Sequence, residues 1–289
     1  MKIGSDAHKE LFCQSFMDSY QDYDPEKLPW PQLDDATLDR LRAIPFWEEA
    51  LTIEREAGVM VSAFAETVSD PMIREAIALQ GREEARHARL IEYLIRRYDV
   101  KITEPPAPVV PANIETAFID FGFGECLDTF FAFGLFELAR QANYFPGALF
   151  TIFDPIIHEE ARHIVFFVNW VTYLQVNQGR EAKILQGTHA VWHYSRAIMN
   201  LVKAFGSGAA DGSGTGFTAT GAQTFIDDLT PTQFLETALK ENTRRMSVFD
   251  DRLLQPQLLP RLATIAYRTL KLLPQRQATA NPEVSVSKF

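Results

Sequence analysis

The pentapeptide Glu-Glu-Ala-Arg-His occurs twice in the chain, at residues 83–87 and again at residues 159–163. In each copy a glutamate and a histidine stand three residues apart, Glu84 with His87 and Glu160 with His163. Residues at i and i+3 lie on one face of an α-helix, about one turn apart. One helix can therefore offer an oxygen and a nitrogen to a metal ion, and two such helices facing each other can hold a pair of ions.

A single Glu-x-x-His is weak evidence for a metal, because a charged residue followed by histidine also occurs on solvated helix faces. Two identical copies are different, since chance does not explain the match. Helical bundles that bind two metals take a further carboxylate from each of the other two helices. A dimetal site in this chain therefore needs two more acids.

Glu54 and Glu56 are the candidate acids on the helix before the first pentapeptide. Glu54 is in phase with an apolar stripe that includes Ala57 and Val61, so it points into the bundle. Glu56 lies about 200° further round the helix. A carboxylate among apolar residues is costly unless it is paired or bound to metal. Glu54 is therefore favoured, with Glu56 as the alternative.

Glu125 is the favoured acid on the helix before the second pentapeptide, and Asp128 is the alternative or an outer partner. A solvated helix face does not suit Glu125, because its neighbours in the sequence are aromatic. These neighbours are Phe121, Phe123, Phe130 and Phe131. Further phenylalanines follow through both helices of this half, and they predict a dense core with a portion of it lining an apolar cavity beside the metals.

Hydrophobic periodicity and helix breakers predict an all-α chain. Pro45 is expected as the first residue of a long helix, and Asp70 as the N-cap of the next one before Pro71. A short helix is expected at 35–43. The long helices are expected at 45–68, 70–98, 114–143, 148–175, 181–205, 230–254 and 258–273, with a flexible loop at 206–221.

A proline-rich crossover at 104–111 separates two predicted helical hairpins and is too long for a tight turn. Hairpin, crossover and hairpin make a four-helix bundle with one long crossover, the connectivity of ferritin-like folds. Each pentapeptide falls in the second helix of its hairpin. The predicted domains are an N-terminal extension (1–44), the dimetal bundle (45–178) and additional C-terminal helices packing on the bundle (179–289).

The pattern Glu54, Glu84-Ala-Arg-His87, Glu125, Glu160-Ala-Arg-His163 resembles that of the ferritin-like carboxylate-bridged diiron superfamily. Members include rubrerythrin, the ribonucleotide reductase small subunit, aldehyde-deformylating oxygenase and the hydroxylases of bacterial multicomponent monooxygenases. The resemblance covers residues 45–175 and is specific for a two-metal site, not for a reaction. It implies bridging roles for Glu84 and Glu160, terminal roles for Glu54 and Glu125, and one nitrogen each from His87 and His163.

The resemblance also implies that Glu83, Arg86, Glu159 and Arg162 orient the histidine rings, the alternative being ion pairs on a helix surface. Four carboxylates and two imidazoles suit iron or manganese better than a thiol-loving metal. Two iron ions are expected, with a manganese–iron pair as the alternative. His158 is a weaker candidate for an additional ligand, and His189 and His193 are expected to serve packing or surface roles.

The expected function is a non-haem diiron oxygenase or oxidase that uses dioxygen to oxidise a small apolar organic substrate. Electrons would come from an external ferredoxin or reductase, because the sequence has no flavin or nucleotide motif. The alternatives are a ferroxidase or rubrerythrin-like peroxide reductase, although a Cys-x-x-Cys pair is missing, and a non-enzymatic metal-binding helical protein. Buried apolar volume beside the metals would favour the oxygenase.

Composition narrows the range of partners. The net charge of −10 argues against nucleic acid, whose phosphates require a basic surface. Cys13 and Cys126 are far apart in the sequence, which favours a reducing compartment and an inert buried thiol at Cys126. Without a signal core or a long apolar run, the chain is expected to be cytoplasmic and to lack a transmembrane segment. The oligomeric state is left open, a homodimer included.

Overall fold

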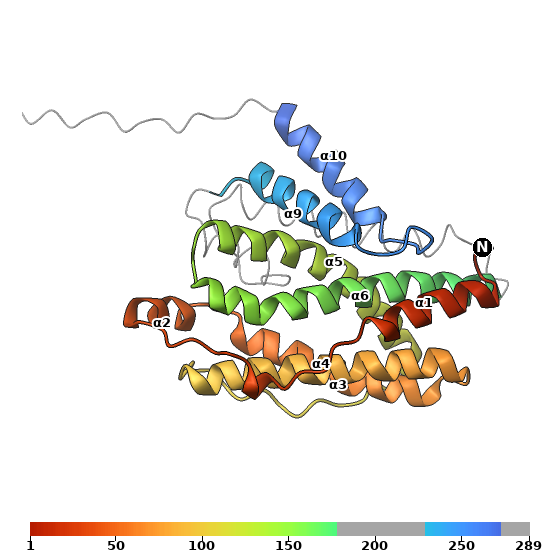
Figure 1. Cartoon of the computed structure of the whole chain (residues 1–289), viewed down its shortest axis with the longest axis horizontal. Helices are drawn as coiled ribbons and strands as arrows, with labels where there is room; N and C mark the ends of the chain where they lie inside the picture. The colour runs from red at the N-terminus through yellow and green to blue at the C-terminus, as the bar shows by residue number, and fades with distance from the viewer. Residues whose placement is uncertain (178–228, 273–289) are drawn as a thin grey trace, which may run out of the picture.

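The computed structural model describes residues 1–177 and 229–272, and this part of the chain is helical, with no β-strand in it (Figure 1). The all-α prediction is therefore confirmed. The helices, in chain order, are α1 (Asp6–Asp18), the 3-10 helix η1 (Pro25–Lys27), α2 (Asp35–Arg42), α3 (Trp47–Thr67), α4 (Pro71–Arg97), α5 (Ile114–Gln141), α6 (Gly147–Asn177), α9 (Pro231–Met246) and α10 (Leu258–Leu272). The predicted helix 181–205 and loop 206–221, with His189 and His193, lie outside the described residues.

Local capping explains most helix boundaries. The Asp70 carboxylate accepts hydrogen bonds from the backbone N–H groups of Met72 and Ile73, which confirms it as the N-cap of α4. Thr230 begins α9 with a capping box. The first long helix begins at Trp47 rather than at Pro45, because the first helical hydrogen bond runs from the Ala50 N–H to the Phe46 carbonyl.

Helices α3 and α4 form one hairpin and α5 and α6 the other, joined by the long segment 98–113. The two hairpins pack together as the expected bundle with one crossover (Figure 1). Helix α9 packs along α5, and α10 packs on α9 and α5. Among the described helices, none combines the length and the apolarity that crossing a bilayer requires.

Two features depart from the sequence prediction. Helix α1 was not predicted, and it lies along α6 and α4 (Figure 1). The helix predicted at 230–254 ends at Met246, because the following residues turn back toward α6. There the buried side chain of Asn169 donates a hydrogen bond to the Leu254 carbonyl (2.8 Å) and accepts one from the Leu254 N–H (2.9 Å).

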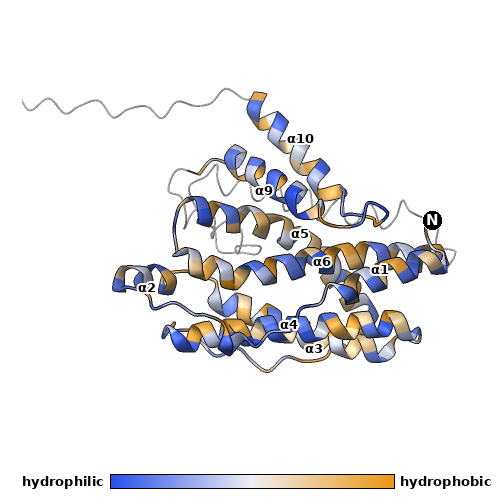
Figure 2. Cartoon of the chain, in the orientation of Figure 1, coloured by the Kyte–Doolittle hydropathy of each residue, from blue (hydrophilic) through white to orange (hydrophobic). Residues whose placement is uncertain are grey.

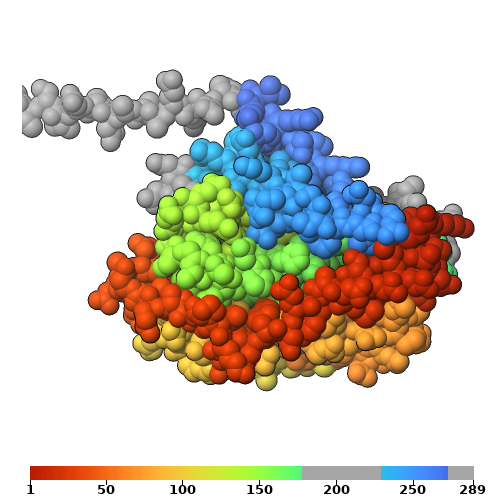
Figure 3. Space-filling view, viewed as in Figure 1, coloured from red at the N-terminus to blue at the C-terminus, as the bar shows by residue number. Residues whose placement is uncertain are grey.

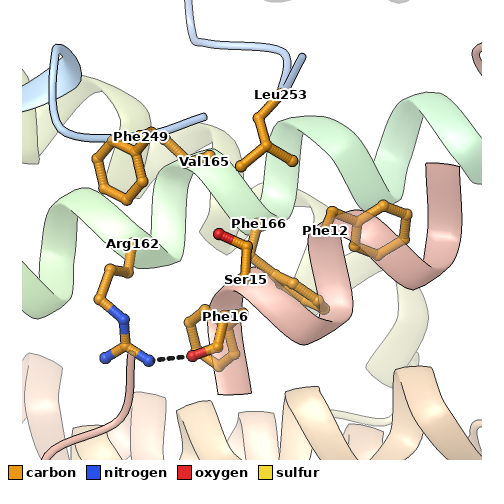
Figure 4. A pocket seen from close by; sticks show the side chains of 8 residues that line it. All are labelled: Phe12, Ser15, Phe16, Arg162, Val165, Phe166, Phe249 and Leu253. Atoms are coloured by element: carbon orange, nitrogen blue, oxygen red, sulfur yellow. Dashed lines mark hydrogen bonds between the residues drawn. The ribbon is translucent and has the colours of Figure 1, made fainter. Parts of the chain in front are cut away.

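The N-terminal segment lies across the face formed by α4 and α6 (Figure 3). Figure 4 shows how α1 is held there, with Phe12 and Phe16 against Phe166 of α6 and with Leu253 from the loop after α9 nearby. The Arg162 guanidinium donates to the Phe16 carbonyl in the same place. Tertiary contacts rather than a strong amphipathic pattern therefore stabilise this helix.

Hydrophobic and hydrophilic residues alternate along the helices (Figure 2), and the buried hydrophobic residues form two clusters. One cluster contains Phe64 and Phe118, and the other contains Trp47 and Leu90. Along α3, α4 and α6, a polar layer falls between the residues that enter one cluster and those that enter the other. This polar layer holds the pentapeptides.

Candidate metal centre

All six residues singled out in the sequence converge in the polar layer of the bundle. The ligand atoms of Glu54, Glu84, His87 and Glu160 lie within 4.8 Å of one another. Those of Glu84, Glu125 and His163 do so as well. Glu84 belongs to both groups, and two adjacent metal positions would share a ligand in this way.

His87 directs its Nδ1 atom at three carboxylates. The distances are 3.2 Å to Glu160 Oε1, 3.4 Å to Glu54 Oε2 and 3.6 Å to Glu84 Oε2. Glu54 thus faces inward from α3, while Glu56 is exposed to solvent and takes no part. The helical phase of Glu54 relative to Ala57 and Val61 predicted this inward orientation.

His163 mirrors this arrangement on the other side of the centre. Its Nδ1 atom lies 3.1 Å from Glu84 Oε1, 3.6 Å from Glu160 Oε2 and 3.7 Å from Glu125 Oε1. Glu84 and Glu160 therefore each face both histidines, which is consistent with the bridging roles that the resemblance implies. Glu54 and Glu125 each face one histidine, which is consistent with the terminal roles that the resemblance implies.

The second nitrogen of each imidazole, Nε2, contacts a glutamate of the other pentapeptide. His87 Nε2 lies 2.7 Å from Glu159 Oε2, and the second oxygen of Glu159 accepts a 2.7 Å hydrogen bond from Arg86. His163 Nε2 lies 2.9 Å from Glu83 Oε2, and Glu83 Oε1 accepts a 2.8 Å hydrogen bond from Arg162.

All four of these outer residues, Glu83, Arg86, Glu159 and Arg162, are buried. The alternative of surface ion pairs is therefore wrong. The first glutamate of each pentapeptide instead bonds both the histidine and the arginine of the other pentapeptide. Helices α4 and α6 are therefore linked by two reciprocal sets of hydrogen bonds. These hydrogen bonds hold both rings in a defined orientation.

The inward-facing nitrogens fit a pair of cations. Because a carboxylate accepts from Nε2–H, the neutral ring carries its lone pair on Nδ1. Within the described part of the chain, the Nδ1 atoms of His87 and His163 are buried and have no hydrogen-bond partner. Between each of these nitrogens and the carboxylates a positive charge is needed, which a proton supplies in the metal-free protein and a metal ion would supply in its place.

The pKa values of the centre also indicate that it requires added positive charge. Burial by itself lowers the pKa of His87, but the surrounding carboxylates, Glu159 and Glu160 foremost, bring it well above its usual value. Burial raises the pKa of Glu54 to about 7. It also brings that of Glu125 well above its usual range, with a further rise from the charge of Glu84. Two divalent ions would offset four carboxylates and remove this repulsion.

Two groups around the centre were not expected from the sequence. Gln80 Nε2 lies 3.1 Å from Glu84 Oε1 and 3.3 Å from Glu125 Oε2, and it donates to both. It precedes Glu84 by four residues, so helical spacing could have revealed it. The Tyr23 hydroxyl donates to Glu159 Oε2 at 3.3 Å. No local pattern marks Tyr23, because it reaches the centre through the path of the N-terminal segment.

The remaining candidates lie elsewhere. Asp128 belongs to neither ligand group. His158 stacks on Phe249, with ring centroids 6.4 Å apart, and so faces the loop after α9. The Cys126 thiol is buried beside Glu125, as expected.

A cavity of about 520 Å³ adjoins the centre between α3, α5 and α6. The side chains of Glu54, Glu84, Glu125 and Glu160 form part of its wall. The rest of the wall is mainly apolar and includes Trp47, Leu135, Phe136, Phe150, Phe153 and Ile157. The phenylalanines thus divide into two sets. Phe121, Phe136, Phe150 and Phe153 line the cavity, whereas Phe118, Phe130, Phe131, Phe133, Phe166 and Phe167 are core.

Comparisons of the chain with protein-family models, curated proteins and solved structures give no match. The chemistry of the centre and of its cavity must therefore indicate what the protein does.

Proposed function

We propose that this protein is a non-haem diiron oxygenase or oxidase of the ferritin-like type, acting on a small apolar organic substrate. One observation carries the proposal. The apolar cavity of about 520 Å³ is walled at one side by the four carboxylates that face the two histidines. This volume falls within the roughly 300–1,000 Å³ typical of small-molecule pockets.

Glu54, Glu84, His87, Glu125, Glu160 and His163 would hold the ions. When bound, two iron ions would supply the activation of dioxygen, the chemistry that protein side chains do not provide. The protein contributes orientation, because the Glu159–His87 and Glu83–His163 pairs set each ring. Gln80 orients the carboxylates of Glu84 and Glu125, since it can donate one hydrogen bond to each.

The cavity would place the substrate against the centre and exclude bulk water. In a monooxygenation, one oxygen atom of dioxygen enters the substrate and the other leaves as water, with two electrons and two protons supplied from outside. We assign the electrons to an external ferredoxin or reductase.

A ferroxidase is the second candidate. The exposed acids Glu49 and Asp128 line the same cavity and would suit an entry path for iron. The apolar wall that extends beyond them supports the oxygenase, because a hydrated ion gains nothing from aromatic contacts.

The two candidates differ in what they need from the cavity. Full-length protein titrated anaerobically with ferrous iron should bind two ions per chain. Adding dioxygen and an artificial reductant should then give product from apolar test substrates. Replacing the cavity residue Ala132 by Phe should leave the iron stoichiometry at two and abolish product, while Ala112→Phe on the surface should change neither.

Iron oxidation that needs no organic substrate and is unaffected by Ala132→Phe would favour the ferroxidase. Fewer than two tightly bound ions would refute both candidates and leave the non-enzymatic helical protein.

A further inference from the structure

The charged residues that line the cavity are all acidic. Besides the four metal-facing carboxylates, Glu49 and Asp128 line it, and no lysine, arginine or histidine of the described residues does so. Because two divalent ions would offset the four carboxylates of the centre, the charge that remains on the cavity wall is that of Glu49 and Asp128. A ligand at this end of the cavity therefore meets apolar surface and negative charge.

Glu49 and Asp128 stand where the cavity meets solvent. Glu49 precedes Glu54 by five residues on α3, and Asp128 follows Glu125 by three residues on α5, so both lie within about two turns of the centre. Glu49, Asp128 and Ile53 are the lining residues in the described part of the chain that are exposed, and Ile53 keeps 46% of its surface accessible. The opening therefore lies between α3 and α5.

These acids have no cationic partner in the part of the chain that the structure describes. Asp128 is exposed to solvent, but many protein atoms lie around its carboxyl group. This enclosure raises the pKa of its carboxyl to about 6, with further contributions from the charges of Glu49 and Glu160. A cation between Glu49 and Asp128 would relieve that repulsion.

Thr129 adds a neutral acceptor next to Asp128. It lines the cavity and is only 4% exposed. A hydroxyl on a cavity wall can accept a hydrogen bond from a ligand. A ligand with N–H groups entering at this point could bond it.

We propose that the cavity binds an apolar primary amine in its protonated form, with the ammonium group near Glu49, Asp128 and Thr129 and the hydrocarbon part against the aromatic wall. This inference rests on the proposed function, because it names the substrate class of the same site. A simple alkylamine resembles a lysine side chain, with a pKa of about 10, and so is charged at neutral pH. At the same position the carboxylate of a fatty acid of equal length would face Glu49 and Asp128, which carry the same charge, and would gain no ion pair there.

The test compares three probes that share an eight-carbon tail: octylamine, 1-octanol and octanoate. Their binding to full-length, anaerobically iron-loaded protein is measured by calorimetry. We expect octylamine to bind roughly tenfold more tightly than octanol, with octanoate the weakest, because a charge-assisted hydrogen bond replaces a neutral one.

The variants Glu49→Gln and Asp128→Asn keep the shape of the cavity and remove one charge each. Each should lower the affinity for octylamine several-fold and leave that for octanol within about twofold. Glu56→Gln provides the matched control, since Glu56 is an exposed acid of α3 outside the cavity. It should change no affinity.

Equal affinities for amine and alcohol would overturn the proposal, as would an amine preference that survives in both variants, because the nitrogen would then be bound by the metals. Loss of iron in Asp128→Asn would assign Asp128 to the metal centre and also overturn it. Failure of the proposed function is distinguishable, since the binding preference can follow Glu49 and Asp128 even if the iron-loaded protein does not reduce dioxygen.

Discussion

The exchange of carboxylates between the two pentapeptides leads to the sharpest prediction. Glu159 is adjacent to Glu160 in the sequence, yet it bonds His87 on α4 rather than His163 on its own helix. Replacing Glu159 by Gln should therefore weaken the metal held by His87. Replacing Glu83 by Gln should weaken the one held by His163.

The size of the effect follows from the contacts. Glu159 accepts 2.7 Å hydrogen bonds from Arg86 and from His87, and both partners are buried. Removing one member of a buried ion pair costs about 3–5 kcal/mol of folding stability, because the remaining charge stays unpaired. Loss of a histidine-orienting partner typically lowers metal affinity by about 10–100-fold.

Double-mutant cycles can measure which histidine is involved. Metal affinity is determined by chelator competition for Glu159→Gln alone and combined with His87→Ala or with His163→Ala. The effect of Glu159→Gln should persist when His163 is absent and disappear when His87 is absent. Urea unfolding of the metal-free protein measures the cost in stability separately.

The opposite pattern would refute the exchange. If Glu159→Gln acted only through His163, each pentapeptide would be a self-contained unit and the reciprocal pairs would have no functional meaning. Glu26→Gln serves as the control, because Glu26 pairs with Arg96 on the surface with both side chains more than half exposed. It should cost less than about 1 kcal/mol and leave metal affinity unchanged.

Three further predictions concern the ligands, the helix packing and the thiols. Glu84→Ala should abolish binding of both ions, whereas Glu54→Ala should leave one, because Glu84 belongs to both ligand groups and Glu54 to one; elemental analysis that finds two ions in either variant would contradict this assignment. Gly81→Ala should destabilise the fold by roughly 1–3 kcal/mol in urea unfolding, because the new Cβ would lie 2.9 Å from the Ser62 backbone nitrogen; Gly124→Ala, with open space around it, should instead gain up to about 1 kcal/mol. Burial raises the pKa of the Cys13 thiol to about 12, so a thiol reagent at pH 8 should label it only after unfolding, and rapid labelling of the native protein would show that α1 opens.

The four bundle helices and the convergence of the six inner side chains could be predicted from local patterns. Periodicity and caps located α3, α4, α5 and α6 to within a few residues, since the capping by Asp70 and the crossover prolines depend on neighbouring residues only. Helical phase distinguished Glu54 from Glu56, because one face of a helix must be buried. The i, i+3 spacing of each pentapeptide placed glutamate and histidine together for the same reason.

Contacts between distant segments could not be predicted in this way. Helix α1 owes its place to Phe12 and Phe16 packing on α6, and the end of α9 at Met246 depends on Asn169 holding Leu254. Neither contact leaves a periodic signal in its own segment.

The sequence by itself thus determined the four helices of the bundle and which of their acids and histidines face inward, because rotation about a helix axis is a local property. Only the tertiary structure decided that Glu83 and Glu159 exchange histidine partners, and that an apolar cavity edged by Glu49 and Asp128 lies beside the centre. Both depend on how the two hairpins are shifted and spaced against each other. Packing of side chains far apart in the chain sets that arrangement, and no local pattern encodes it.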